Sequence, residues 1–361
     1  MNKLHLLFLT LLISCNSPNC DIVIHNGTII DGTGSPRFKG TVAIASDKVV
    51  YVGPKKKFSA KKTIDAENKI VSPGFINMLS WGYNTLLEDG RSLSDLRQGV
   101  TLEVFGEGNS PGPVGKIGDK DFIGFADAME KLVKNGVSPN IASFLGATNV
   151  RKLTVGYDNR DATNNELKTM EQIVETAMKE GALGIGSSLI YAPADYANTN
   201  ELITICRVAS KFNGKYISHM RNEGRDVLKA LDELITISKE ANIPAEIYHL
   251  KASRKPNWFL LDSIINRVER ARKKGLKITA DVYTYPASST GLTGVIPTWV
   301  QEGGHRAWIE RMKSKKVRKR LLDDIRKELS EQPPDGILMV GFKNDSLDKI
   351  YRGKTIAEAS A

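Results

Sequence analysis

Two histidines of this chain stand where a metal ion could be bound and used to activate water. His219 closes the strand-like segment YISH, and His249 closes the strand-like segment EIYH. A carboxylate, Glu107, follows a third such segment, TLEVFG. Two imidazoles and a carboxylate form a zinc ligand set that leaves one coordination position for water, and zinc lowers the pKa of such a water to about 7. These residue types therefore predict a hydrolytic metal centre.

Each of these residues also has a structural interpretation. A single histidine at a strand end could be a hydrogen-bonded structural residue. The ligand hypothesis rests on finding two of them at the ends of consecutive strand segments, 249 − 219 = 30 positions apart. Glu107 could instead cap the helix that follows it, or pair with Arg221 or Lys251. The sequence leaves these alternatives open.

Strand-like and helix-like segments alternate from Lys69 onward, and these segments must position the ligands. The clearest helix, Asn164 to Glu180, begins with the capping box Thr163-Asn-Asn-Glu166. Further helices are predicted over 226–241 and 261–274. Repeated alternation of this kind is typical of a parallel sheet. The seven predicted strands are Ile70–Met78, Thr101–Phe105, Ile141–Leu145, Ala182–Ser187, Tyr216–His219, Ala245–Leu250 and Lys277–Tyr283.

The fold class is therefore α/β, and the pattern fits a (β/α)8 TIM-like barrel whose eighth strand is missing. An open doubly wound sheet is the alternative, although no Gly-x-Gly-x-x-Gly motif follows the first strand. Functional residues of a barrel gather at the C-terminal ends of its strands. His219 and His249 occupy such positions.

The residues before the barrel, which is assigned to 71–361, divide into two parts. Residues 21–70 contain strand-like runs separated by Asn26-Gly27 and Asp31-Gly32, which indicates hairpins and a small β domain. Residues 1–20 have the pattern of a lipoprotein signal and tether. Their apolar run is too short to span a bilayer and ends in a lipobox at Cys15. A plainly cleaved signal is the alternative. We expect export to the periplasm or cell envelope, with membrane contact only through lipid on Cys15.

The basic charge of the chain is concentrated in one segment. The formal net charge is +10, and residues 306–328 contain ten basic and four acidic residues, so that segment contributes 10 − 4 = +6. Its apolar residues approximate a helical stripe. We interpret the charges as a solvated helix face and predict no nucleic-acid partner, because no aromatic stacking motif accompanies them.

Seven segments resemble, in order, the N-acyl-D-amino-acid deacylase (D-aminoacylase) branch of the amidohydrolase superfamily. They are DIVIHNGTIIDGTG, VSPGFIN, LRQGVTLEVFGEG, EGALGIGSSLIYAPADYANTNELI, YISHMRNEG, EIYHLKAS and ADVYTYPASSTGL. The resemblance covers nearly everything from Asp21 onward. It implies a metal-dependent barrel beside a small β domain built from both chain ends. It also implies hydrolysis of the amide that joins an acyl group to a D-amino acid.

The resemblance assigns metal ligands in this sequence. His219 and His249 fall on two zinc ligands of the family. The third family ligand is a cysteine whose matching position here is Gly108, so the role passes to the adjacent Glu107. The implied cofactor is a single zinc ion.

The resemblance also points to substrate-binding residues for a small-molecule N-acyl amino acid. Tyr191, Tyr283 and Ser289 match regions that line the family's substrate pocket. Arg221 or Lys251 could hold the substrate carboxylate, and a structural ion pair is the alternative for both.

Two departures from the family pattern affect the mechanism. Leu79 and Trp81 replace the family's His-x-His, and since neither can coordinate zinc, we expect at most one catalytic ion. The family's general base is an aspartate at the end of the eighth strand, and no segment here matches that strand. Asp281 is the remaining barrel-end aspartate. It could substitute as the base, or orient the loop after the seventh strand. We therefore expect a truncated chain.

These observations together predict a zinc amidohydrolase that acts on N-acyl-D-amino acids. A second hypothesis is a non-catalytic binding protein, or an inactive fragment, on the same scaffold. A third keeps the enzyme and changes the substrate to a cyclic amide or a dipeptide, because the fold does not determine the substrate.

Overall fold

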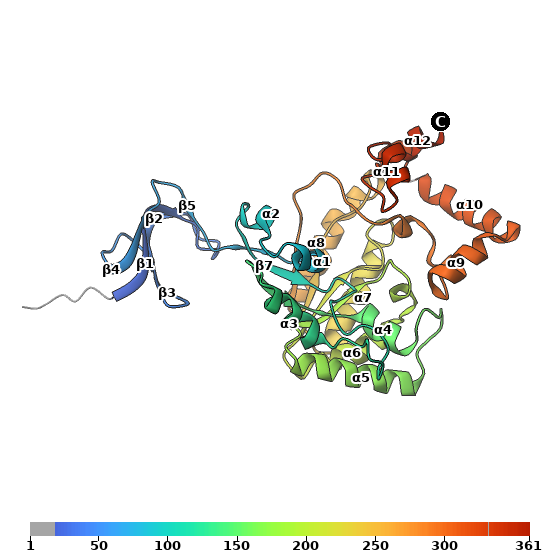
Figure 1. The fold of residues 1–361 in the computed structure, drawn as a ribbon, viewed down its shortest axis with the longest axis horizontal. Helices are drawn as coiled ribbons and strands as arrows, with labels where there is room; N and C mark the ends of the chain where they lie inside the picture. Colours follow the sequence, from blue (N-terminus) through green and yellow to red (C-terminus); the bar gives the residue numbers. More distant parts are fainter. Residues whose placement is uncertain (1–18, 331) are drawn as a thin grey trace, which may run out of the picture. The chain divides into compact units, whose positions relative to one another are not determined.

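The computed structural model describes residues 19–330 and 332–361, which fall into two compact units divided between Phe75 and Ile76 (Figure 1). The predicted signal and the lipid site at Cys15 lie outside the described residues, so export and lipidation stay predictions. None of the helices in the described ranges combines the length and apolar character needed to cross a membrane.

The smaller unit is built on a five-stranded sheet. Its order is β3-β2-β1-β4, with β5 paired to β1. The strands are β1 (Asn19–Ile29), β2 (Phe38–Ala45), β3 (Lys48–Gly53), β4 (Ser59–Asp65) and β5 (Ile70–Val71). The chain therefore has an N-terminal β sheet, as the hairpin-like pattern indicated, and β1 begins within the predicted tether. The domain bounds of 21–70 stay a prediction.

The hairpin predicted at Asn26-Gly27 is wrong. Both residues lie inside β1, where the register with β2 shifts between Ile24 and Gly27. Asn26 takes a left-handed φ of 56°, and its side chain donates a hydrogen bond to Asp65 at 3.0 Å. Asparagine tolerates this conformation, so the dipeptide forms an irregularity within one strand and not a turn between two.

The larger unit contains six of the seven predicted strands and the second part of the remaining one, and two of the predicted strands are divided. One sheet has the order β13-β12-β11-β10-β9 and the other the order β6-β7-β8. The predicted strand 70–78 is divided into β5 and β6, which belong to different sheets, with Pro73 between them. The predicted strand 141–145 is divided into β8 and β9. The strands are β6 (Phe75–Asn77), β7 (Val100–Phe105), β8 (Asn140–Ser143), β9 (Leu145–Gly146), β10 (Gly184–Ser188), β11 (Lys215–His219), β12 (Ala245–Ile247) and β13 (Ile278–Ala280).

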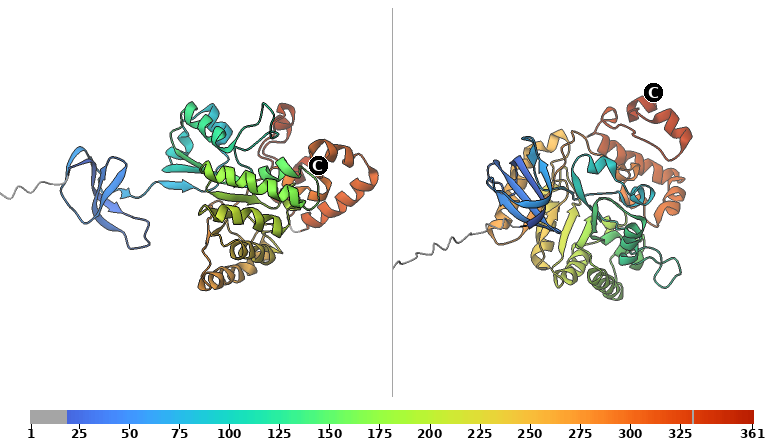
Figure 2. Two further views of the ribbon diagram at one scale, coloured as in Figure 1. Left: turned by 90° about the horizontal axis from the view of Figure 1, so that it is seen from below. Right: turned by 60° about the vertical axis from the view of Figure 1, so that its left-hand side comes forward.

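Helices follow most of these strands, as the alternating sequence pattern predicts. Consecutive helices from α4 to α8 contact one another (Figures 1 and 2). The capping box of Thr163 and Glu166 is present at the start of α5. The helices are α1 (Tyr83–Glu88), α2 (Leu93–Leu96), α3 (Phe125–Asn135), α4 (Ala147–Thr154), α5 (Asn164–Lys179), α6 (Thr199–Ser210), α7 (Val227–Glu240), α8 (Leu261–Lys273), α9 (Gly304–Met312), α10 (Lys315–Leu329), α11 (Asp345–Tyr351) and α12 (Ile356–Ser360).

The basic segment 306–328 forms two helices where the sequence pattern suggested one. Helix α9 ends at Met312 and α10 starts at Lys315, with Ser314 at the N-cap position. Most of the basic side chains of α10 are exposed. Arg320 lies over the Trp299 ring, 3.9 Å from its centroid, and the Trp299 indole donates to Asp324.

The main core lies between the five-stranded parallel sheet and helices α4 to α8. Ile185 and Tyr216 from the sheet pack with Met170, Cys206 and Leu231 from the helices, and all five are fully buried. This packing holds the strand ends in register, so that residues at the ends of β10, β11 and β12 lie along one edge.

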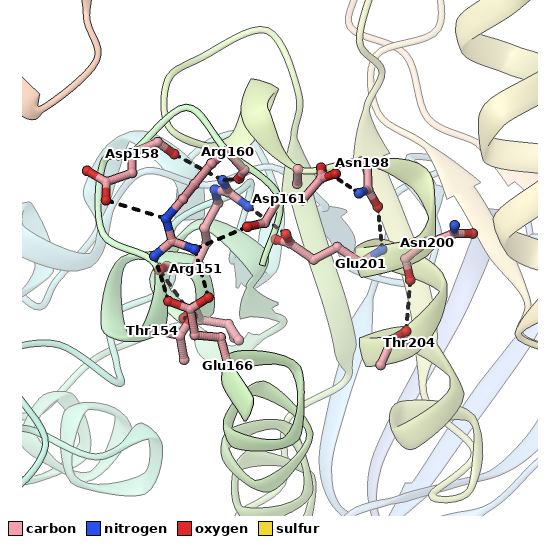
Figure 3. A network of polar contacts seen from close by, with 12 residues as sticks. Arg151, Thr154, Asp158, Arg160, Asp161, Glu166, Asn198, Asn200, Glu201 and Thr204 are labelled. Carbon is pink, nitrogen blue, oxygen red and sulfur yellow. Dashed lines mark hydrogen bonds and ion pairs between the residues drawn. The ribbon is translucent and has the colours of Figure 1, made fainter. Parts of the chain in front are cut away.

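A buried ion pair joins α4 to α6 beside this core. Arg151 and Glu201 are 1% and 5% exposed, and their charged atoms lie 2.5 Å apart. Arg151 also donates to the carbonyls of Asp158 and Arg160 in the loop before α5. Figure 3 shows Arg151 between that loop and Glu201. The pair therefore ties two helices and a loop together.

Candidate metal centre

Three strands bring the predicted metal ligands to one place. His219 is the last residue of β11, and His249 lies two residues beyond the end of β12. The two strands are parallel neighbours, with Ser218 opposite Ile247. Because the C-terminal ends of parallel strands meet at one edge, the two histidines lie side by side. Glu107 reaches the same point two residues beyond the end of β7.

The three side chains form a compact buried cluster. His219 Nδ1 lies 2.9 Å from Glu107 Oε1, and His249 Nε2 lies 3.4 Å from the same oxygen. One candidate ligand atom from each residue lies within 4.8 Å of the others. The residues are only 7–8% exposed. Two imidazole nitrogens and a carboxylate oxygen are a donor set that zinc accepts.

The backbone explains why residue 107, and not residue 108, supplies the carboxylate. Gly108 has a φ of +70°, and a Cβ atom at this position would lie 2.7 Å from the Cβ of Ser188. A side chain at 108 would therefore require the backbone to move. Glu107 accepts hydrogen bonds within the cluster, so the alternatives of a helix cap or a pair with Arg221 or Lys251 are not what the structure shows.

The electrostatics of the cluster favour a charged arrangement. Burial disfavours ionised Glu107, but hydrogen bonds from His219 and His249 outweigh it and lower its pKa to about 2. Burial likewise disfavours charged His249, but hydrogen bonds to Glu107 and Glu223 raise its pKa to about 9. A cation bound here would take the place of a proton shared between carboxylate and imidazole.

Trp81 contacts this cluster from the position of the missing His-x-His. Its indole Nε1 donates a hydrogen bond to Glu107 Oε2 at 2.8 Å. The carboxylate is thus held at both oxygens, Oε2 by the indole and Oε1 by the histidines. The partly buried neighbour Leu79 packs in an apolar cluster with Val104 and Tyr248.

Glu223 is a site residue that the sequence analysis missed. It lies four residues after His219, and its Oε1 is 2.9 Å from His249 Nδ1 and 2.7 Å from Lys251 Nζ. Burial raises its pKa, but the contacts with His249, His219 and Lys251 outweigh this effect and lower it. The spacing His-x-x-x-Glu after a strand end was the signal that could have found it.

Asp281 holds the backbone of His249. Its Oδ1 accepts a hydrogen bond from the His249 backbone N–H at 2.6 Å, where His249 has a left-handed φ of 39°. Its Oδ2 is buried and has no hydrogen-bond partner within 19–330 and 332–361. Burial raises the pKa of Asp281. The carboxylate therefore supports a strained ligand backbone, and its role as a base stays a prediction.

Three of the predicted substrate-binding residues surround the cluster. The centroids of the Tyr191 and His219 rings lie 5.8 Å apart. The centroids of the Tyr283 and His249 rings lie 6.2 Å apart. Lys251 Nζ lies 5.4 Å from the centroid of Tyr283. The two tyrosine rings and the ammonium of Lys251 thus lie around the candidate metal position.

The other two predicted substrate-binding residues are placed differently. Nε and Nη2 of Arg221 donate to the two carboxylate oxygens of Glu233, each at 2.9 Å. Nη1 donates to the Asp195 carbonyl, and Nη2 also donates to the Ala197 carbonyl. This arrangement favours the alternative of a structural ion pair. Ser289 is exposed in the loop that follows β13, beside Thr290, whose hydroxyl bonds Tyr191 at 2.6 Å.

Comparison with known proteins relates this site to a class of metal-dependent hydrolases. No family model matches the sequence. D-aminoacylase from Alcaligenes xylosoxydans xylosoxydans is 30% identical over 285 residues, which is 75% of this chain and 59% of the relative. The N-acyl-D-glutamate deacylase of the same organism is 28% identical over 290 residues, 75% of this chain and 58% of the relative.

Solved structures agree with the sequence matches. One is a structure of D-aminoacylase from a study of its binuclear metal centre, described as one-metal activation and second-metal attenuation. It is 30% identical, with a TM-score of 0.66 over 74% of this chain and 59% of its own. Another is N-acyl-D-glutamate deacylase from Bordetella bronchiseptica with zinc and a phosphonate mimic of the tetrahedral intermediate. It is 27% identical, with a TM-score of 0.68 over 76% of this chain and 60% of its own.

By sequence and by fold, the chain is similar to D-aminoacylase and to N-acyl-D-glutamate deacylase. A crystal structure of D-aminoacylase that is 30% identical to this chain defines a subset of the amidohydrolases. The chain spans less than two thirds of the length of these relatives. The resemblance predicted from the seven sequence segments is confirmed.

Proposed function

We propose that this protein hydrolyses the amide bond of N-acyl-D-amino acids with a water activated by one zinc ion. The observation that carries the proposal is the buried cluster of Glu107, His219 and His249 at the strand ends. Support comes from the match to D-aminoacylase over 75% of the chain. The proposal concerns the whole protein, since the chain spans 59% of that relative.

The geometry of the cluster indicates which atoms would hold the ion. Glu107 Oε1, His219 Nδ1 and His249 Nε2 face one another and fit a site with three protein ligands. When bound, zinc would lower the pKa of a water and polarise the substrate carbonyl. His249 must release its proton for this, and Glu107 is already ionised because its pKa is about 2.

The surrounding residues could bind and orient the substrate. The ammonium of Lys251, near the Tyr283 ring, can bind a carboxylate such as that of an N-acyl amino acid. The Tyr191 hydroxyl is a hydrogen-bond donor of the kind that stabilises a developing oxyanion. Asp281 holds the His249 backbone with Oδ1, which leaves Oδ2 as the oxygen able to carry a proton.

We expect one zinc ion per chain at saturation. The indole N–H of Trp81 donates to Glu107 Oε2, so this oxygen is already engaged in a hydrogen bond and would be less able to hold a second ion. Trp81 and Leu79 also lack atoms that bind zinc. Elemental analysis of zinc-loaded protein after removal of loosely held metal measures the ratio. A ratio of two would contradict this expectation.

The function is tested with the zinc-loaded protein as isolated from its natural source. It is incubated with N-acetyl-D-amino acids, the matching L-forms, cyclic amides and dipeptides, and the released amine is measured. We expect turnover of the D-forms, with the L-forms at least about 100-fold slower. Turnover confined to cyclic amides or dipeptides would change the substrate class. Saturable binding without turnover would favour a non-catalytic binding protein.

A further inference from the structure

We propose that Glu223 is a positioning residue that holds both metal-binding histidines through their outward ring nitrogens. The inference rests on the proposed function for its metal centre, and goes beyond it by adding a carboxylate that does not itself bind the ion. Four observations carry it: the direction of the two rings, an unpartnered buried nitrogen, the attachment of Glu223 to Lys251, and the backbone that carries Glu223.

The two histidines turn different nitrogens toward Glu107. His219 presents Nδ1, and His249 presents Nε2. Their remaining nitrogens, His219 Nε2 and His249 Nδ1, both face Glu223, at 3.8 Å from Oε2 and 2.9 Å from Oε1 respectively. The rings lie 4.5 Å apart and nearly perpendicular, at 86°. The two oxygens of one carboxylate thus face two differently oriented rings.

A metal-bound imidazole requires such a partner. When one ring nitrogen gives its lone pair to a metal, the other carries a hydrogen that needs an acceptor. Histidine ligands usually donate this hydrogen to a carboxylate or a carbonyl, which fixes the tautomer and the ring plane. In the ranges 19–330 and 332–361, buried His219 Nε2 has no hydrogen-bond partner. Glu223 Oε2 lies 3.8 Å from this nitrogen, beyond hydrogen-bond distance, and a shift of less than about one ångström would form the bond.

Lys251 fixes the carboxylate of Glu223 in place. Its ammonium donates to Glu223 Oε1 at 2.7 Å and to the His249 carbonyl at 2.9 Å. Lys251 Nζ and His249 Nδ1 also lie 2.9 Å apart. Because both are donors when His249 Nδ1 carries its hydrogen, we interpret them as two donors that share Oε1 of Glu223. Lys251 thereby holds the Glu223 carboxylate beside the His249 ring.

The backbone holds Glu223 between the two ligand loops. The Asn222 side chain accepts hydrogen bonds from the N–H groups of Gly224 and Asp226, which turns the chain after β11. The Glu223 carbonyl accepts from the N–H of Ser253 at 2.7 Å, in the loop that follows His249. The backbone of Glu223 is therefore attached to the loops that follow both histidines, which places its carboxylate to keep the two rings aligned.

The test compares zinc affinity in Glu223→Gln with that in Glu233→Gln. The two carboxylates are 14% and 13% exposed and each pairs with a basic side chain, but only Glu223 faces the histidines. Competition with a coloured chelator gives the affinities. We expect Glu223→Gln to weaken zinc binding by about 10- to 100-fold, because an amide has one acceptor oxygen for two imidazoles and an ammonium. We expect Glu233→Gln to stay within about twofold of the wild type.

The outcomes separate this inference from the proposed function. Unchanged zinc affinity in Glu223→Gln, or an equal loss in both variants, would overturn the positioning role while leaving the metal centre intact. A wild-type protein that binds no zinc would overturn both. If Glu223→Gln does not fold, a crystal structure of the zinc-loaded wild type decides. Glu223 oxygens within about 3.2 Å of both outward nitrogens support the role, and distances above 3.5 Å to both reject it.

Discussion

Replacing His249 by alanine is expected to weaken zinc binding by about 100- to 1,000-fold and to abolish zinc-dependent hydrolysis. Structural zinc sites bind with about 10–16 kcal/mol, so each ligand accounts for roughly 3–4 kcal/mol. A loss of about 1.4 kcal/mol is tenfold in affinity. His249 Nε2 lies 3.4 Å from Glu107 Oε1, within the cluster that would surround the ion. Calorimetric or chelator-competition titration with zinc measures the change.

The control for this experiment is His305→Ala. His305 is exposed in α9, and its ring contacts Trp308 and not the cluster. We expect its zinc affinity to match that of the wild type. We expect His219→Ala to behave like His249→Ala, because its Nδ1 lies 2.9 Å from the same carboxylate oxygen. Wild-type affinity in both His219→Ala and His249→Ala would reject the assigned ligands.

The convergence of the candidate ligands could be predicted because their positions follow from local patterns. His219 and His249 close apolar runs of the kind that form buried parallel strands, and the ends of neighbouring parallel strands must meet. Strand pairing was less predictable. The residues 141–145 read as one strand, yet β8 pairs with β7 and β9 pairs with β10. Only the position of these neighbours divides the segment, and no residue within it indicates the division.

The residues around the ligands depend on contacts between distant parts of the chain. Glu223 reaches the histidines because a loop thirty residues later, at Ser253, holds its carbonyl. Arg221 is turned away from the site because Glu233 on α7 binds its guanidinium. Trp81 contacts Glu107 across 26 positions. A pattern within one segment could not predict these pairings, whereas each strand end is specified within its own segment.

Replacing Arg151 by methionine is expected to destabilise the larger unit by about 3–5 kcal/mol. The substitution leaves Glu201, 5% exposed, as a buried carboxylate without its cation, and breaking a buried pair at one partner costs this much. It also removes the donors to the carbonyls of Asp158 and Arg160. Urea unfolding followed by circular dichroism measures the free energy of unfolding.

The loss of unfolding free energy caused by Arg151→Met should become smaller at low pH. Burial raises the pKa of Glu201, while the charge of Arg151 lowers it. Without Arg151 the folded-state pKa of Glu201 rises further above its unfolded value. The variant therefore gains stability relative to the wild type as pH falls through that raised pKa, because Glu201 takes up a proton and its buried charge is removed. An equal loss at pH 5 and pH 8 would contradict this explanation.

Arg160→Met separates the effect of burial from that of charge pairing. Arg160 belongs to the same network in Figure 3 and binds both oxygens of Glu166, at 2.7 and 2.8 Å. Its side chain, however, is 43% exposed. Solvent replaces the lost partner of an exposed pair, so we expect a loss much smaller than that of Arg151→Met. Similar losses in the two variants would mean that hydrogen-bond geometry, and not burial of charge, determines the stability of this network.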